Sequence, residues 1–132
     1  MSDTSKILIV DDDKFLMGMY SLKFKKAGFE VVAALSPEEA LQKLHDGFHP
    51  DIFLMDVIMP GMSGLDLLEQ IQKENLIGAS TVVILSNQGE STDIDRAKQL
   101  HVNGYIVKAT TIPSEVVDEV VKIHKAHMAK PA

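Results

Sequence analysis

The sequence contains no cysteine and no tryptophan, and it has no long apolar run. Without cysteine, the chain has neither a disulfide framework nor a thiolate metal site. The first apolar run, from Ile7 to Val10, is far too short for the core of a signal peptide or for a membrane-spanning helix. These absences favour a cytoplasmic protein that does not insert into a membrane.

Basic residues are also in deficit. The 13 lysines and arginines face 19 aspartates and glutamates, which gives a formal net charge of −6. A protein that binds nucleic acid normally presents a basic surface, so we expect no direct contact with nucleic acid. The mild acidity also has a simpler explanation, because net charge keeps a small domain in solution.

Short apolar runs alternate regularly with longer amphipathic stretches. The 132 residues, 45% of them hydrophobic, suit one domain over residues 1–132 with an ordered core over about residues 5–128 and short tails. The runs of strand length are Lys6–Val10, Glu30–Leu35, Asp51–Met55, Thr81–Leu85 and Tyr105–Val107.

Each strand-like run is followed by a stretch that predicts a helix. The first such stretch extends from Asp13 to about Gly28. Three apolar residues at helical spacing and a glycine where the helix would stop predict this helix. The spaced residues are Phe15, Met19 and Leu22. The second helix begins after Ser36, which is expected to be its cap, with Pro37 at the first helical position.

Three more helices are expected further along the chain. Ser63–Lys73 has an apolar inner side, and Thr92 with Asp95 is expected to cap a helix that extends to about His101. Pro113 opens the last helix, whose buried stripe is expected to consist of Val116, Val117, Val120 and Val121.

The alternation predicts an α/β fold of the (βα)5 type. Strands that read as unbroken apolar runs are buried on both faces, as in a parallel sheet. Right-handed crossovers then place helices on both sides of the sheet. We expect a doubly wound, five-stranded parallel sheet of order 2-1-3-4-5, which is the flavodoxin-like order.

Charged and polar side chains follow the predicted strands where ligands bind in such sheets, beyond the carboxyl ends. Asp11 and Asp12 follow the first strand, Asp56 the third, Ser86 the fourth and Lys108 the fifth. Carboxylates gathered at one edge must take up protons or bind a cation, and Mg²⁺ prefers such oxygen ligands. A carboxylate can also attack phosphorus, with a lysine to neutralise the phosphoryl oxygens. Taken singly, such residues are more often caps, as we expect for the neighbouring Asp13, or solvated charges.

At these residues the sequence resembles the receiver domain of two-component response regulators. The segment Ile7 to Asp13 is similar to the family's first strand and acidic pair, and Asp51 to Gly64 is similar to its phosphoacceptor segment with Pro60. Val83–Ser86 is similar to the strand that ends in Ser or Thr, and Gly104–Lys108 to the strand that ends in Lys. The resemblance covers essentially the whole chain.

The resemblance implies a role for each of these residues. Asp56 is the expected phosphoacceptor, assisted by Ser86 and Lys108. The expected ligands of Mg²⁺, or of Mn²⁺ in its place, are Asp11, Asp12, Asp56 and the backbone carbonyl of Ile58. Ser86 and Tyr105 form the expected switch pair; alternatively, Tyr105 is only a half-buried strand aromatic.

The resemblance also implies partners. A sensor histidine kinase or a histidine phosphotransfer protein would donate the phosphoryl group in a phosphorelay, and an unknown protein would be the target, as for single-domain receivers. The expected contact surface is the face of the fourth helix, fifth strand and fifth helix, and the chain is expected to be a monomer or a weak dimer through it. The domain would not be an enzyme, beyond assisting its own phosphotransfer and slow autodephosphorylation.

The sequence departs from the family around the expected site. Ala109 follows Lys108, where the family usually has a proline joined by a cis bond. Because a cis bond costs about 0.5–1 kcal/mol before proline and roughly 3–4 otherwise, we expect a trans bond and a rearranged loop through Thr110 and Thr111. Asn87 and Gln88 also differ from the usual pattern. Ile58 is apolar, which predicts slow hydrolysis because its bulk hinders an attacking water.

Three other functions compete with this one. A receiver-like interaction module that is never phosphorylated is kept open by Ala109. A phosphatase of the haloacid dehalogenase type also uses an aspartate after a strand, but its motif would need Thr or Val where this chain has Phe15. A flavodoxin-type cofactor protein is disfavoured because three aspartates, rather than a phosphate-cradling loop, follow the first strand.

Overall fold

The computed structural model describes residues 5–86 and 91–129. Five parallel strands form one sheet of order β2-β1-β3-β4-β5, as the sequence predicts. The strands are β1 (Lys6–Val10), β2 (Glu30–Ala34), β3 (Ile52–Asp56), β4 (Thr81–Ser86) and β5 (Gly104–Val107). The departures Asn87 and Gln88 lie outside the described residues.

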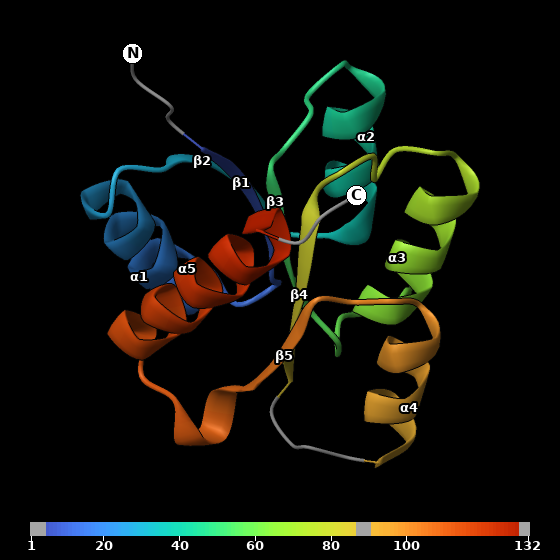
Figure 1. The fold of residues 1–132 in the computed structure, drawn as a ribbon. Helices are drawn as coiled ribbons and strands as arrows, with labels where there is room; N and C mark the ends of the chain where they lie inside the picture. Colours follow the sequence, from blue (N-terminus) through green and yellow to red (C-terminus); the bar gives the residue numbers. More distant parts are fainter. Residues whose placement is uncertain (1–4, 87–90, 130–132) are drawn as a thin grey trace.

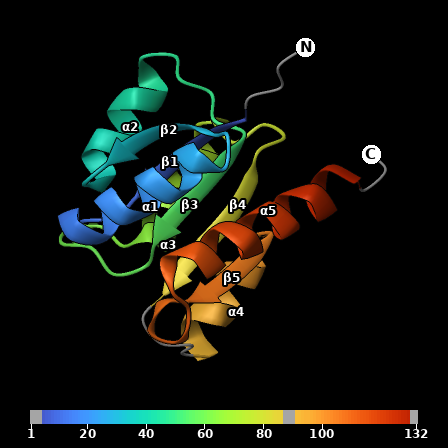
Figure 2. The same cartoon turned by 90° about the vertical axis from the view of Figure 1, so that its left-hand side faces the viewer.

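Helices cover both faces of the sheet (Figure 1, Figure 2). They are α1 (Lys14–Lys26), α2 (Pro37–His45), α3 (Gly64–Lys73), α4 (Ser91–Gln99) and α5 (Pro113–Ala129), with a 3₁₀ turn, η1 (Lys108–Thr110), before the last. One core packs α1 and α5 against the sheet, and the other packs α2, α3 and α4 against the opposite face. The central strands β1, β3 and β4 therefore have both faces buried, and this is why they read as continuous apolar runs.

Helix α1 lies where the sequence predicts it, but the apolar residues singled out by their spacing do not face the core. The buried face consists of Met17, Tyr20 and Phe24. Phe15 is 76% exposed and Leu22 is 53% exposed. Helix α1 thus carries a second apolar stripe that faces away from the sheet.

Local sequence signals fix most helix ends. Asp13 caps α1 by accepting the Leu16 N–H at 3.0 Å, and Ser36 caps α2 by accepting the Glu39 N–H at 3.1 Å. Gly28, with φ of 99°, follows the end of α1 in the left-handed conformation that favours glycine. The predicted cap at Thr92 is wrong, because α4 already begins at Ser91, and this helix ends at Gln99 rather than near His101.

Helix α5 is fixed along its length. Val116, Val117 and Val120 are buried in the core that it shares with α1, whereas Val121 is only partly buried. Near its carboxyl end, the His124 Nδ1 lies 2.8 Å from the Thr81 Oγ1 at the start of β4. This contact ties the carboxyl-terminal part of α5 to the sheet.

Candidate functional site

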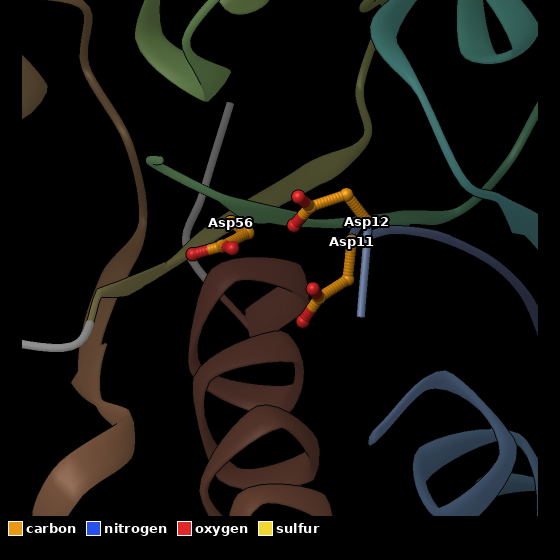
Figure 3. A group of neighbouring side chains, drawn as sticks. All are labelled: Asp11, Asp12 and Asp56. Carbon is orange, nitrogen blue, oxygen red and sulfur yellow. The ribbon is translucent and has the colours of Figure 1, made fainter. Parts of the chain in front are cut away.

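The carboxyl edge of the sheet gathers three aspartates. Asp11 follows β1 directly and Asp56 is the last residue of β3, and these two strands are hydrogen-bonded neighbours. One carboxylate oxygen from each of Asp11, Asp12 and Asp56 lies within 4.8 Å of the other two (Figure 3). Asp11 and Asp56 are buried, at 0% and 4% exposure, and Asp12 is exposed. The sheet therefore brings together the three aspartates that the sequence singles out.

Lys108 enters this cluster from the end of β5. Its Nζ donates to the Asp11 Oδ2 at 2.8 Å and lies 3.5 Å from the Asp56 Oδ2. The Lys108–Ala109 peptide bond is trans, as expected, and the chain continues through the 3₁₀ turn η1. The sequence departure at Ala109 therefore leaves the ammonium group within the cluster.

The other oxygen of Asp11 is also engaged. Asp11 Oδ1 accepts the Asp13 N–H at 3.0 Å, while the Asp11 N–H donates to the Ala34 carbonyl at 3.1 Å. Asp11 is thus held by its backbone and by both carboxylate oxygens. Asp13 belongs to this local turn and to the cap of α1, which agrees with the structural role expected for it.

The negative charge of Asp56 is only partly neutralised within the cluster. Burial raises the pKa of Asp56 from 3.8 to about 6, with Lys108 opposing this rise and Asp11 and Asp12 reinforcing it. Burial alone would lower the pKa of Lys108, but its hydrogen bond to Asp11 and the attraction of Asp56 outweigh this, so the pKa is raised. Lys108 therefore remains charged and leaves Asp56 only partly compensated.

A close backbone approach places Asp56 against the start of α3. The Gly64 N–H donates to the Val57 carbonyl at 2.8 Å, and a Cβ at Gly64 would overlap the Asp56 carbonyl oxygen. Ser63 caps α3 in a reciprocal capping box with Asp66. The glycine in the phosphoacceptor-like segment is therefore required by contact with the aspartate itself.

Ser86 and Tyr105 lie on the same side of the sheet. Ile84 packs in the core beneath α2, α3 and α4, and Ser86, two residues further along β4, points to the same face. Tyr105 is the register partner of Ile84 on β5 and packs against the same core. Ser86 is buried and Tyr105 is half-buried, so the two residues expected to form the switch share the face covered by α4.

Sequence reasoning missed one residue near the cluster, Tyr20. It is 2% exposed on the inner face of α1. Burial raises its pKa, Lys108 opposes this, and Asp11, Asp56 and Asp13 reinforce it, so the phenol lies within electrostatic range of the cluster. The available signal was its helical spacing from Met17 and Phe24, the other buried residues of α1.

The donor set fits a hard divalent cation. Three carboxylates converge, one of them open to solvent, and Mg²⁺ favours a few carboxylates together with retained waters. The side chain of Ile58 is 64% exposed and lies in the loop that follows Asp56. The predicted contribution of its carbonyl stays a prediction.

Comparison with known proteins places the chain in a family. Residues 7–120 match the response regulator receiver domain, and the chain belongs to this family. It is 33% identical over 121 residues to the chemotaxis protein CheY of Thermotoga maritima, covering 91% of this chain and 98% of that protein. Receiver domains of this family are the phosphorylation-activated signalling domains of two-component systems.

Other relatives are longer than this chain. The phosphate regulon transcriptional regulatory protein PhoB of Escherichia coli is 30% identical over 112 residues, which cover 85% of this chain and 48% of that protein. The chain thus spans about half the length of several of its curated relatives. A putative response regulator from Chloroflexus aurantiacus superposes with a TM-score of 0.81 at 32% identity, covering 93% of this chain and 99% of that one.

None of the helices within 5–86 and 91–129 combines the length and the apolar character that crossing a bilayer requires.

Proposed function

We propose that Asp56 accepts a phosphoryl group from a phosphohistidine, and that this event switches the chain between two signalling states. The observation that carries the proposal is the convergence of Asp11, Asp12 and Asp56 within 4.8 Å, with the Lys108 ammonium 3.5 Å from Asp56. In this reaction a carboxylate oxygen of Asp56 bonds to phosphorus as the bond from phosphorus to the imidazole nitrogen breaks. The imidazole keeps the electron pair and takes up a proton.

Each neighbour has a proposed part in this transfer. Asp11, Asp12, Asp56 and the Ile58 carbonyl would hold Mg²⁺, or Mn²⁺, which supplies positive charge to the phosphoryl oxygens. Lys108 would neutralise another of these oxygens, and Asp11 already directs the ammonium toward the site. The chain assists its own phosphorylation and slow dephosphorylation in this way and turns over no other substrate.

The readout is proposed to pass through Ser86 and Tyr105. The Ser86 hydroxyl would donate a hydrogen bond to the phosphoryl group, and the resulting shift of the end of β4 would change the position of Tyr105 on the next strand. Their common place on the face beneath α4 supports this pairing. The signal would then reach another protein, and the chain would act in the cytoplasm as a monomer or as a weak dimer through α4, β5 and α5.

The phosphodonor is proposed to be a sensor histidine kinase or a histidine phosphotransfer protein. Large exposed apolar side chains lie in three segments at the same sheet edge: Phe15 at 76%, Ile58 at 64% and Ile112 at 61% exposure. Leu22 extends this surface along α1, a helix without any acidic residue. Exposed apolar residues around a site suit a protein partner that covers the site during transfer.

Intact-mass measurement tests the phosphoacceptor. Incubation with an acyl phosphate and Mg²⁺ should add one phosphoryl group, and the adduct should be lost in Asp56→Ala or when a chelator removes the metal. Asp118→Ala, on the exposed side of α5, is the matched control and should keep the adduct. If no adduct formed under any condition, the chain would be a receiver-like module that is not phosphorylated.

The donor surface has a separate test. Phe15→Ser with Leu22→Ser should slow transfer from a purified phosphorylated histidine kinase that labels the unmodified chain, and should leave labelling by an acyl phosphate unchanged. Met128→Ser removes an equally exposed apolar side chain, 59% exposed, near the opposite end of the fold. An equal loss in this control would argue against docking on α1.

A further inference from the structure

The helices α4 and α5 flank β5 (Figure 2). Each of these two helices carries charge of opposite sign at its two ends. Their amino-terminal halves are acidic, with Asp93 and Asp95 on α4 and Glu115, Asp118 and Glu119 on α5. Their carboxyl-terminal halves are basic, with Arg96 and Lys98 on α4 and Lys122 and Lys125 on α5. This order suits the helix dipoles, but it also concentrates cations at the sheet edge opposite Asp56.

A hollow of about 530 Å³ lies between these two basic ends. Lys98, His101 and Lys122 are exposed around it, and no carboxylate contributes to its lining within the described chain. The Lys122 Nζ lies 4.0 Å from the Glu119 Oε1 on the same helix, with both side chains largely exposed. This hollow is thus edged by cations although the protein has a net charge of −6.

The floor of the hollow is apolar and fixed in position. Val102 and Ile123 are partly buried in the two cores, and Ala126 is exposed beside them. Ile123 packs directly on the backbone of β5, where a Cβ at Gly104 would overlap its side chain. The floor therefore offers a contact for one apolar side chain between the cations.

A chain of hydrogen bonds fixes the polar wall of the hollow. The Asn103 Oδ1 accepts the Val82 N–H at 2.8 Å, so its Nδ2 is the donor to the His127 Nδ1 at 3.0 Å. The His127 Nε2 then carries the hydrogen and donates to the Ala79 carbonyl at 3.1 Å. Both nitrogens of His127 are thus occupied, which leaves Lys98, Lys122 and His101 to meet a ligand.

We infer that this hollow binds an acidic segment of a partner protein, with one apolar side chain on the floor and carboxylates beside Lys98 and Lys122. A long phosphate backbone or a flat anionic membrane would extend over the acidic halves of the same helices, where Glu115 and Glu119 repel it. A short acidic peptide segment, in contrast, would contact only the basic ends of the two helices. This inference adds to the proposed function the kind of partner that the α4–β5–α5 face would bind. Only the role of this contact in signalling rests on the proposed function.

Binding can be measured with a defined probe. A synthetic peptide of twelve residues, blocked at both ends, with a central leucine flanked by glutamates and aspartates, is titrated into the ¹⁵N-labelled chain without any phosphodonor. We expect shifts confined to residues 98–103 and 122–127, with weaker binding at 0.5 M salt because added ions screen exposed charges. A peptide with lysines in place of the acids, and one with serine in place of leucine, should bind less.

Charge reversal identifies the surface. Lys98→Glu with Lys122→Glu should weaken binding about tenfold or more, and the Lys98→Arg with Lys122→Arg variant should retain it. Lys43→Glu with Lys73→Glu makes the same change in net charge at the ends of α2 and α3 and should have no effect. Preserved dispersion of the amide spectrum shows that each variant is folded.

Three outcomes would overturn the inference. The first is that the peptide causes no localised shifts. The second is that the control pair Lys43→Glu with Lys73→Glu weakens binding equally. The third is that no peptide binds while sedimentation shows a concentration-dependent dimer that Lys98→Glu with Lys122→Glu abolishes. The last result would assign the hollow to a second copy of the chain. Because the titration uses the unphosphorylated protein, its failure is distinct from a failure of Asp56 to accept a phosphoryl group.

Discussion

Replacing Asp56 with asparagine should stabilise the folded protein at neutral pH, although it removes the proposed phosphoacceptor. The side chain is 4% exposed, and burial raises its pKa from 3.8 to about 6 despite the opposing effect of Lys108. The ionised carboxylate is therefore less favourable in the folded state than in the unfolded chain. Asparagine has a similar shape and carries no charge, so it avoids this cost.

The magnitude follows from the pKa. Between about pH 4 and pH 6 the folded state retains a proton that the unfolded chain releases, so the free energy of unfolding falls as the pH rises through this window. About two pH units at about 1.36 kcal/mol each give a cost of about 3 kcal/mol above pH 6. Asp56→Asn should recover most of it at pH 7.5 and almost none below pH 4, where Asp56 is protonated in both states.

Urea unfolding in the presence of a chelator measures the difference. The unmodified chain and Asp56→Asn are compared at pH 7.5 and at pH 4, with Asp118→Asn as an exposed control that should differ little from the unmodified chain. A gain of about 2–3 kcal/mol that disappears at pH 4 is expected. The reasoning is refuted if asparagine destabilises the protein at pH 7.5, or if the gain is the same at both pH values.

Three further predictions test the surroundings of Asp56. Millimolar Mg²⁺ should raise the unfolding midpoint at pH 7.5, and this increase should disappear in Asp12→Ala; a persistent increase would place the cation elsewhere. Gly64→Ala should lower the free energy of unfolding in urea by about 2 kcal/mol because the added Cβ overlaps the Asp56 carbonyl oxygen. The control Gly18→Ala, in the middle of α1, adds a Cβ that meets nothing within 4 Å and should be neutral or stabilising. Ile58→Asn should accelerate loss of the phosphoryl group, followed by intact mass over time, and an unchanged rate would show that the apolar side chain does not hinder water.

Much of the fold was predictable because its signals are local or repeat along the chain. Continuous apolar runs predicted the strands, and Ser36 and Pro37 predicted the cap and the first residue of α2 as the structure has them. The order of the strands followed from the alternation itself. The carboxyl ends of the predicted strands likewise place Asp11, Asp56 and Lys108 at one edge of the sheet.

What sequence reasoning missed depends on contacts between distant segments. Phe15 and Leu22 have the spacing of a buried stripe, but the direction of α1 relative to the sheet decides that Met17, Tyr20 and Phe24 face the core. Periodicity gives the spacing of apolar residues and cannot choose between two apolar stripes on one helix. Likewise, the preference of Lys108 for Asp11 over Asp56 arises only when residues almost a hundred positions apart meet.

That preference links the resting state of the site to its proposed chemistry. Asp11, Asp12 and Asp56 together carry three negative charges when ionised. Among the described residues, Lys108 is the cation that lies against them, and its ammonium group offsets one of these charges. It lies closer to Asp11 than to Asp56. A divalent cation would match the remaining two charges and would also take over the neutralisation of Asp11. Lys108 would then be free to move toward an incoming phosphoryl group without leaving a buried carboxylate uncompensated. The electrostatic cost at Asp56 in the metal-free fold would then favour binding of a divalent cation, and this would account for a buried aspartate where asparagine would cost the fold less.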